Sequence, residues 1–190
     1  MKNIAIFASG SGTNAQNITD YFKTDKSIKV SLILTNNPDA LVLERAAKLG
    51  IPSMVFTRKD FYESDSVLNT MREYKITFIV LAGFLWMIPN NLLKAFPRRI
   101  INIHPALLPK YGGKGMYGDK VHQAVIRSGD KKTGISIHYV NDHYDEGEII
   151  FQDSFEIQAD DTAESIANKV HAMEYKYFPK VIEEIIQKIS

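Results

Sequence analysis

The sequence has no cysteine among its 190 residues. This absence excludes a disulfide framework, a zinc site built from thiolates and catalysis by a thiol nucleophile. It also agrees with a reducing compartment, so a cytoplasmic location is expected.

Excess charge of one sign is also missing, because 23 basic and 22 acidic residues leave a net charge of +1. A broad nucleic-acid-binding surface is therefore not expected, although a local patch could bind a few phosphates. No apolar run approaches the roughly 20 residues of a membrane span. The N-terminal segment MKNIAIFASGSG predicts a first strand rather than a signal peptide. We expect small-molecule substrates, no nucleic-acid or membrane partner, and a monomer or a homodimer.

Short apolar runs alternate with helical patterns through the first half of the sequence. Strands are predicted at Asn3–Phe7, Lys29–Thr35, Ser53–Phe56, Phe78–Leu81 and Ile100–Ile103. Helices are predicted at Thr13–Phe22, Ala40–Leu49, Ser64–Tyr74 and Pro89–Phe96. The run FIVLA is apolar at every position, as in a parallel strand covered on both faces. This alternation predicts an α/β fold with a Rossmann-like, doubly wound, mostly parallel sheet and helices on both faces.

The second half has a different pattern. A helix is predicted at Lys120–Ser128, and two strands are predicted in TGISIHYV and EIIFQDSFEI. Their short acidic connection predicts an antiparallel pair, which brings the sheet to about seven strands. A helical pattern runs from Asp161 to Lys188, with a break expected at Pro179 because proline lacks the backbone N–H. Residues 1–190 are expected to form one domain.

A glycine-rich segment, FASGSGTNAQ, follows the first strand and opens the first helix. Gly10, Gly12 and Ala15 match the loose G-x-G-x-x-[G/A] pattern, in which glycines allow a tight turn and the helix N-terminus offers N–H groups to a phosphate. A lone match is equally compatible with a turn that binds nothing. A dinucleotide enzyme also needs an acidic residue at the end of the second strand, and Asp39 lies beyond it. A small phosphate group is therefore favoured over NAD.

Two polar side chains end the fifth predicted strand, in INIHPALLPKYGG. Asn102 and His104 lie on one face of this strand, at the carboxyl edge where open α/β sheets bind ligands. An amide donor beside an imidazole can stabilise charge on the oxygen of a carbonyl under attack, and histidine can transfer a proton near neutral pH. From these two residues alone, a buried structural histidine with a strand-capping asparagine remains the favoured interpretation.

The turn NDHYDEGE could supply a carboxylate to favour an imidazolium. Its candidates are Asp142, Asp145, Glu146 and Glu148, and the spacing does not choose among them. Most such clusters are solvated turns. His138 alternates with the apolar positions of its own strand and could also face a polar site.

Other chemistries find little support in the sequence. The G-x-S-x-G and H-E-x-x-H motifs are both absent. His171 and Glu174 fall three residues apart on a helix and could bind a metal, but an exposed helical pair is the preferred interpretation. No metal is expected.

Taken together, five segments resemble the folate-dependent formyltransferases: IFASGSGTN, VLAGFLWMIP, INIHPALLPKYGGKGMYG, TGISIHYVNDHYDEGEII and QDSFEIQADDTAESI. The resemblance covers nearly the whole chain, and N-x-H-P-[SA]-L-L-P is its specific motif. It implies the formyltransferase fold and 10-formyltetrahydrofolate as co-substrate. The implied reaction is direct transfer of the formyl group to the amine of glycinamide ribonucleotide, with no covalent enzyme intermediate and no metal.

The resemblance also implies roles for individual residues. Asn102, His104 and Asp145 match the catalytic residues of the family, where the amide and a protonated imidazole favoured by the aspartate would stabilise a tetrahedral oxyanion. Contacts to the acceptor's phosphate and ribose are expected from Gly12, Thr13, Asn14 and Glu174. Folate contacts are expected from Leu85, Trp86, Met87, Ile88 and Asn102. His122 and His138 are expected to support the site without touching the substrate.

The sequence departs from the family pattern at Trp86 and Ser64, where many or some relatives carry arginine, so the folate contacts there stay open. The glycine-rich loop 111–119 could fold over the substrate.

Two alternatives remain at this point. A formyl-folate enzyme that acts on methionyl-tRNA or hydrolyses the folate usually has a further domain, which 190 residues do not accommodate. A nucleotide-binding or sensory α/β module without catalysis would leave Asn102, His104 and Asp145 unexplained.

Overall fold

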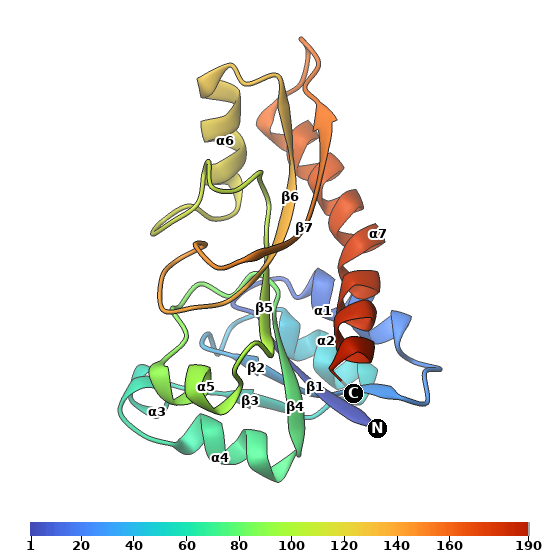
Figure 1. Ribbon diagram of the computed structural model, residues 1–190, viewed down its shortest axis with the longest axis vertical. Coiled ribbons are helices and arrows are strands. Elements are labelled where there is room, and N and C mark those ends of the chain that lie inside the picture. The colour runs from blue at the N-terminus through green and yellow to red at the C-terminus, as the bar shows by residue number, and fades with distance from the viewer. Residues whose placement is uncertain (190) are drawn as a thin grey trace.

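In the computed structural model, residues 1–189 are described and form one seven-stranded sheet flanked by helices (Figure 1). The strands are β1 (Lys2–Phe7), β2 (Ile28–Thr35), β3 (Ser53–Val55), β4 (Ile76–Leu81), β5 (Ile100–His104), β6 (Lys132–Tyr139) and β7 (Ile149–Glu156). The helices are α1 (Thr13–Tyr21), α2 (Val42–Leu49), α3 (Arg58–Tyr62), α4 (Ser66–Glu73), α5 (Asn90–Ala95), α6 (Asp119–Ser128) and α7 (Ala163–Lys188).

The sheet has the strand order β3-β2-β1-β4-β5-β6-β7. The first five strands pair in parallel, and β6 and β7 complete the sheet as antiparallel neighbours of β5. The chain therefore runs outward from β1 in one direction and then in the other, which is the doubly wound arrangement. The predicted fold class is confirmed, including the antiparallel pair at the far side.

Helices cover both faces of the sheet because its central strands are apolar on both faces. Along β1, Ile4 and Ile6 pack into one hydrophobic cluster with residues of α1, α2, α6 and α7. Ala5 and Phe7 alternate with them and pack into a second cluster with residues of α3, α4 and α5. These last three helices lie together at the bottom of Figure 1. The continuous apolar runs of the sequence thus reflect burial from two sides.

The long helix α7 continues through Pro179 to Lys188, so the predicted break at this proline is wrong. Proline cannot donate the backbone hydrogen bond that the carbonyl four residues earlier, on Tyr175, would accept. The side-chain amide of Asn17, on α1, donates to that carbonyl instead at 3.1 Å. Pro179 itself is buried, and its packing together with this substitute donor explains why the helix persists.

The short helix α3 is absent from the sequence-based prediction. It begins with a capping box in which Thr57 accepts from the Asp60 backbone N–H and Asp60 accepts from the Thr57 backbone N–H. Five residues are too few for an apolar period to stand out. The T-x-x-D spacing was the available signal for it.

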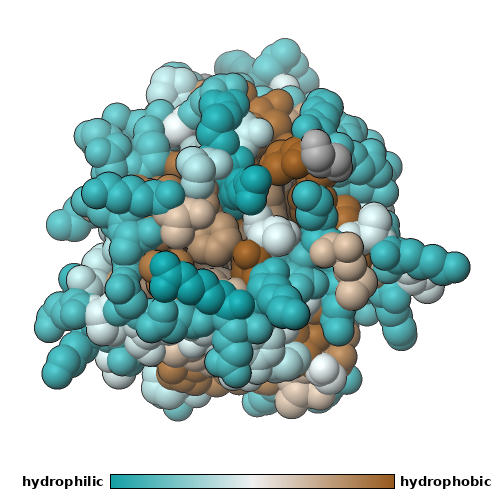
Figure 2. Space-filling model, turned by 60° about the horizontal axis from the view of Figure 1, so that its bottom comes forward, coloured by the Kyte–Doolittle hydropathy of each residue, from teal (hydrophilic) through white to brown (hydrophobic). Residues whose placement is uncertain are grey.

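The surface shown in Figure 2 is mostly hydrophilic, with hydrophobic side chains in separate areas among the polar ones. Such scattered exposure is ordinary for folded proteins. Within residues 1–189, no helix is long and apolar enough to cross a membrane.

Candidate active site

The site is centred on the carboxyl end of β5, where the sheet changes from parallel to antiparallel. Strand alternation places Asn102 and His104 on the same face of β5. The antiparallel register then sets His138 of β6 directly opposite Asn102. His104 and His138 are buried, with exposed fractions of 3% and 2%, so their polar atoms need partners inside the protein.

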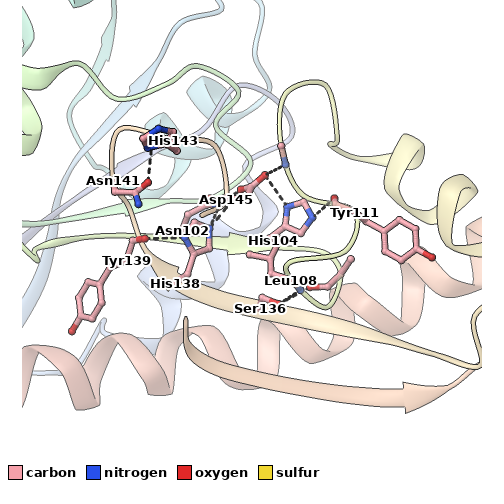
Figure 3. A network of polar contacts seen from close by, with 12 residues as sticks. Asn102, His104, Leu108, Tyr111, Ser136, His138, Tyr139, Asn141, His143 and Asp145 are labelled. Atoms are coloured by element: carbon pink, nitrogen blue, oxygen red, sulfur yellow. Dashed lines mark hydrogen bonds and ion pairs between the residues drawn. The ribbon is translucent and has the colours of Figure 1, made fainter. Parts of the chain in front are cut away.

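Asp145 joins these side chains into one network (Figure 3). Its Oδ1 accepts from Asn102 Nδ2 at 3.3 Å, and its Oδ2 lies 3.6 Å from His104 Nδ1. The backbone N–H of Gly113 donates to the same Oδ2 at 3.0 Å. The structure thus selects Asp145 from the four carboxylates of the acidic turn; Asp142 is exposed and pairs only with its neighbour His143 among the contacts of residues 1–189.

The backbone of the β6–β7 connection aims Asp145 inward. Asp145 has φ 56°, the left-handed region that residues with a side chain seldom adopt. Gly147 follows, and a Cβ there would lie 2.7 Å from the carbonyl carbon of Tyr139. The loop therefore returns to β7 along a path that only glycine permits at position 147.

Hydrogen bonds fix the roles of the ring nitrogens. His138 Nδ1 donates to the carbonyl of Tyr139 at 2.9 Å, so its Nε2 accepts from Asn102 Nδ2 at 3.0 Å. His104 Nε2 donates to the carbonyl of Tyr111 at 2.7 Å. The 3.6 Å between His104 Nδ1 and Asp145 is too long for a hydrogen bond. The two longest contacts described in this network both involve Asp145: the one with His104 Nδ1 at 3.6 Å and the one with Asn102 Nδ2 at 3.3 Å.

Burial controls the ionisation of the two central groups. It lowers the pKa of His104 below its ordinary value, although the Asp145 carboxylate and the Tyr111 carbonyl oppose that shift. Burial also acts to raise the pKa of Asp145, but the neighbouring rings of His138 and His104 and the Gly113 N–H outweigh burial and leave this pKa below its ordinary value. Burial thus acts against a charged His104 imidazole, while the ionised Asp145 beside it acts in its favour.

The glycine loop connects β1 to α1 and therefore lies at the carboxyl end of β1. Gly12 is the N-cap of α1, with φ 71°, and a Cβ there would lie 2.8 Å from Val42 Cα. Ser9 ties the loop to its neighbours, because its hydroxyl donates to Asn36 Oδ1 at 2.7 Å and accepts from the Leu85 N–H at 3.1 Å. Among residues 1–189 no side chain caps the first turn of α1, so its first backbone N–H groups are available to a ligand.

Asn14 links this loop to α7. Its Nδ2 donates to Glu174 Oε2 at 2.8 Å, and burial raises the pKa of Glu174 despite that bond and the nearby His171. Within residues 1–189, Asn14 Oδ1 is buried without a hydrogen-bond partner. An unsatisfied buried acceptor beside a carboxyl group suits a hydroxyl-bearing ligand that can bond to both. The preferred interpretation of His171 and Glu174 as an exposed pair is wrong for Glu174, which is 6% exposed.

These parts surround one cavity of about 580 Å³. It is lined by the glycine loop with Gly12, Thr13 and Asn14, by Leu85, by Asn102, His104 and Asp145, by loop residues 113–118, and by His122, His171 and Glu174. This volume lies within the usual range for small-molecule sites. The predicted catalytic and phosphate-side residues thus meet at one cavity.

Of the segment expected to line a folate pocket, only Leu85 borders the main cavity. Trp86, Met87 and Ile88 border an adjoining hollow of about 50 Å³ that also reaches Asn102, His138 and Asp145. Trp86 packs in an aromatic cluster with Phe56, Phe61 and Tyr62.

A cation also lies on this cluster. The Arg58 guanidinium lies 5.3 Å from the Trp86 ring centre and 5.0 Å from that of Tyr62. A cation thus lies beside Trp86, supplied by α3. Because α3 itself was not predicted, sequence reasoning missed this contact.

The loop 111–119 borders the site in several places. Gly113, Lys114, Gly115, Met116, Tyr117 and Gly118 line the cavity. His122 is buried behind this loop, and burial lowers its pKa; its Nδ1 has no hydrogen-bond partner among residues 1–189. The Tyr111 carbonyl was also missed, because a sequence does not show where a backbone acceptor will lie. In the described part of the chain, no group of three or more His, Asp or Glu side chains is arranged to hold a metal ion.

Comparison with known proteins shows that the chain matches one protein family over most of its length. The family model described as formyl transferase matches residues 2–182. A chloroplastic phosphoribosylglycinamide formyltransferase of Arabidopsis thaliana is 41% identical over 98% of this chain and 66% of its own length. The chain thus spans about two thirds of that plant relative. The phosphoribosylglycinamide formyltransferase of Bacillus subtilis is 37% identical over 98% of this chain and 95% of its own length.

A solved structure agrees with these sequence matches. The crystal structure of phosphoribosylglycinamide formyltransferase from Bacillus halodurans has a TM-score of 0.88 and 36% sequence identity. The match covers 100% of this chain and 97% of that one. The likeness therefore extends over the whole arrangement of strands and helices described above.

Proposed function

Because the chain belongs to the formyl transferase family, we propose that it transfers the formyl group of 10-formyltetrahydrofolate to the amine of glycinamide ribonucleotide, a step of purine biosynthesis. One observation carries this proposal: Asn102, His104 and Asp145 converge on a cavity whose opposite wall is the glycine loop at the start of α1. The cavity thus offers carbonyl chemistry and an anion site within the reach of one phosphorylated substrate.

The phosphate of the acceptor is proposed to bind at Gly12, Thr13 and Asn14. The backbone N–H groups of the first turn of α1 have no partners within the helix and can donate to an anion there. Glu174 and Asn14 are proposed to hold the ribose, because a sugar hydroxyl can donate to the unsatisfied Asn14 Oδ1 and bond to the Glu174 carboxyl group.

The folate is proposed to enter on the side of Leu85, Trp86, Met87 and Ile88. These residues connect the main cavity with the adjoining hollow that reaches Asn102. Trp86 lines the adjoining hollow, and an aromatic side chain there suits the flat rings of a folate. Arg58, which lies beside the Trp86 ring, is proposed to bind an anionic portion of the folate. Arg58 would thereby replace the arginine that many relatives carry at position 86.

The reaction then proceeds by direct attack. The amine nitrogen forms a bond to the formyl carbon, and the carbonyl electron pair moves to the oxygen. Asn102 Nδ2 exchanges its longer bond to Asp145 for a bond to this oxygen, while its shorter bond to His138 keeps the amide oriented. His138 thus supports the site through Asn102.

His104 is proposed to carry the proton between the two nitrogens. Its lowered pKa leaves Nδ1 free to accept the proton that the attacking amine loses. The imidazolium formed is stabilised by Asp145 and lies beside the oxyanion. The proton then passes to the N10 nitrogen of the folate as the bond from carbon to that nitrogen breaks, so the atoms balance and no covalent enzyme intermediate forms.

Residues 1–190 are proposed to act as one catalytic domain, which is supported by the single seven-stranded sheet and by the span of the family match. A cytoplasmic location is part of the proposal and is supported by the lack of cysteine.

The decisive experiment measures formation of tetrahydrofolate from 10-formyltetrahydrofolate with and without glycinamide ribonucleotide. Turnover should require the ribonucleotide, and formylated ribonucleotide should appear in equal amount. Turnover with water alone at the same rate would contradict transfer and favour hydrolysis. As control, His104→Ala should bind the folate with an affinity close to that of the wild type while losing most of the turnover, which separates chemistry from binding.

A further inference from the structure

We propose that Tyr111 is a positioning residue: its hydroxyl anchors the backbone carbonyl that orients the His104 ring. This inference rests on the proposed function, in which His104 moves the proton. Among the hydrogen bonds of residues 1–189, the Tyr111 side chain bonds to Ser128 and Asp130 and not to Asn102, His104 or Asp145. Its ring points away from His104 in Figure 3. Its influence must therefore pass through its backbone.

The first step is the contact with His104. The imidazole has polar neighbours at both nitrogens, and the Tyr111 carbonyl is the closer, at 2.7 Å from Nε2. A carbonyl can only accept, so this bond keeps the proton on Nε2 and leaves Nδ1 as the nitrogen that faces Asp145. The tautomer and the ring orientation that the mechanism needs are both set by one backbone atom.

The second step is what holds that backbone atom in place. Tyr111 has φ 58°, a left-handed conformation that is unfavourable for a residue with a Cβ. It is followed by Gly112 and Gly113, which restrict the chain least. Residue 111 is held from outside this segment, since its ring packs against the hydrophobic cluster that includes Ile4 and Ile6. Its hydroxyl adds a second, polar attachment.

The third step identifies that anchor. The Tyr111 hydroxyl lies 2.8 Å from Asp130 Oδ2 and 2.5 Å from Ser128 Oγ, at the C-terminal end of α6 and the turn before β6. Ser128 donates its own proton to the Val125 carbonyl at 2.7 Å, so Ser128 Oγ and Asp130 Oδ2 are two acceptors that share the single tyrosine proton. Lys110 holds Asp130 from the other side at 3.0 Å. The anchor is formed by the last residue of α6 and by the turn that follows it, and neither Ser128 nor Asp130 lines the cavity.

The same segment also sets the partner of His104. Gly113, two residues after Tyr111, donates its N–H to Asp145 Oδ2. A shift of residue 111 would thus move the acceptor at Nε2 and a donor to Asp145 together. A displacement near 1 Å at a reacting group can cost up to about a hundredfold in rate, so a loose anchor should appear in turnover.

The test is Tyr111→Phe, which keeps the ring and removes only the hydroxyl. We expect kcat to fall roughly tenfold while KM for both substrates stays within about twofold. In proteins with 15N-labelled histidine, His104 should be the Nε2–H tautomer in the wild type and a mixture of tautomers in the variant. Its pKa should also move lower, because the Tyr111 carbonyl opposes the effect of burial in the wild type. The other titratable groups that face this ring are Asp145, His138 and His122.

Two further variants separate positioning from simple stabilisation. Lys110→Met removes the ion pair with Asp130 but leaves the tyrosine anchor, so kcat and the His104 tautomer should match the wild type. Asp130→Asn keeps an acceptor for the Tyr111 hydroxyl and leaves Ser128 intact, so kcat and the His104 tautomer should again match the wild type. The double change Asp130→Leu and Ser128→Ala removes both acceptors and should have the same effect as Tyr111→Phe.

An unchanged tautomer in Tyr111→Phe would overturn the proposal, as would a lower melting temperature with unchanged kcat. If Tyr111→Phe does not fold, the double variant at Asp130 and Ser128 decides by the same measurements. The NMR reading needs no turnover, so it tests the link from Tyr111 to His104 even if the transferase assay fails.

Discussion

The side-chain amide of Asn17 donates to the backbone carbonyl of Tyr175 across the interface of α1 and α7, at 3.1 Å. This carbonyl is the one that Pro179 leaves without a donor inside α7. A residue near the N-terminus thus compensates for a proline near the C-terminus, and the two positions should be energetically coupled.

Asn17→Ala is therefore expected to lower the free energy of unfolding by about 0.5–1.5 kcal/mol, the usual net value of one hydrogen bond. In a Pro179→Ala background the restored backbone N–H should make the same change nearly neutral. Urea denaturation of the four proteins in this cycle measures the coupling. Equal losses from Asn17→Ala in both backgrounds would show that the amide does not serve this carbonyl.

The choice of catalytic carboxylate is tested by two matched changes in one turn. Asp145→Asn should lower kcat by about 10²–10⁴, because the Asp145 carboxylate stabilises the His104 imidazolium formed in the reaction. Asp142→Asn should leave kcat within about twofold, since Asp142 is exposed and pairs with His143. Steady-state kinetics with both substrates decide, and the opposite ranking would remove Asp145 from the proposed mechanism.

The pH dependence of kcat/KM should report the ionisation of His104 in the free enzyme. Because burial lowers its pKa, the neutral base persists below pH 6.5, and activity should fall only as the pH drops through that lowered pKa. Asp145 opposes the shift, so residual activity of Asp145→Asn should have its acidic limb at still lower pH. An ionisation of the substrate amine would not move with the variant. An acidic limb above pH 6.5, or one that Asp145→Asn leaves in place, would argue against His104 as the base.

The glycine loop offers a paired test of backbone shape. Gly12→Ala should lower the free energy of unfolding by about 1–3 kcal/mol, because φ is 71° and the new Cβ would meet the Val42 backbone. Gly10→Ala should change stability little, since the structure leaves open space around a Cβ at that position. Thermal and chemical denaturation compare the two. For Gly12→Ala we also expect weaker protection by ribose phosphates in thermal-shift measurements, and equal protection would place the anion elsewhere.

The fold was predictable where each segment carries its own pattern. The mixed sheet was predicted from two patterns. The strands β1, β4 and β5 are apolar runs, because strands buried on both faces need apolar side chains at successive positions. The short acidic link between β6 and β7 indicated an antiparallel pair. The break at Pro179 was not correctly predicted, because the donor that replaces its N–H comes from Asn17, 158 residues from Tyr175 in the sequence. Prediction rules that use only neighbouring residues do not include a hydrogen-bond donor so far away in the sequence.

The candidate site was predictable in part for the same reason. Strand alternation placed Asn102 and His104 together, while the choice of Asp145 came from the family resemblance and not from spacing. The carbonyl of Tyr111 and the cation of Arg58 were missed. One is a backbone atom placed by a loop, and the other belongs to a helix too short to show a period, so neither has a sequence pattern of its own.

The bond between Asn14 and Glu174 spans 160 residues of sequence and closes the cavity between the first helix and the last. A chain emerging from the ribosome would complete β1, the glycine loop and β5 long before α7 is released. The nascent protein can therefore assemble most of its sheet without a finished binding cavity. Substrates cannot draw the folding equilibrium toward the native state until synthesis is almost complete, so early folding must rely on the sheet's own core.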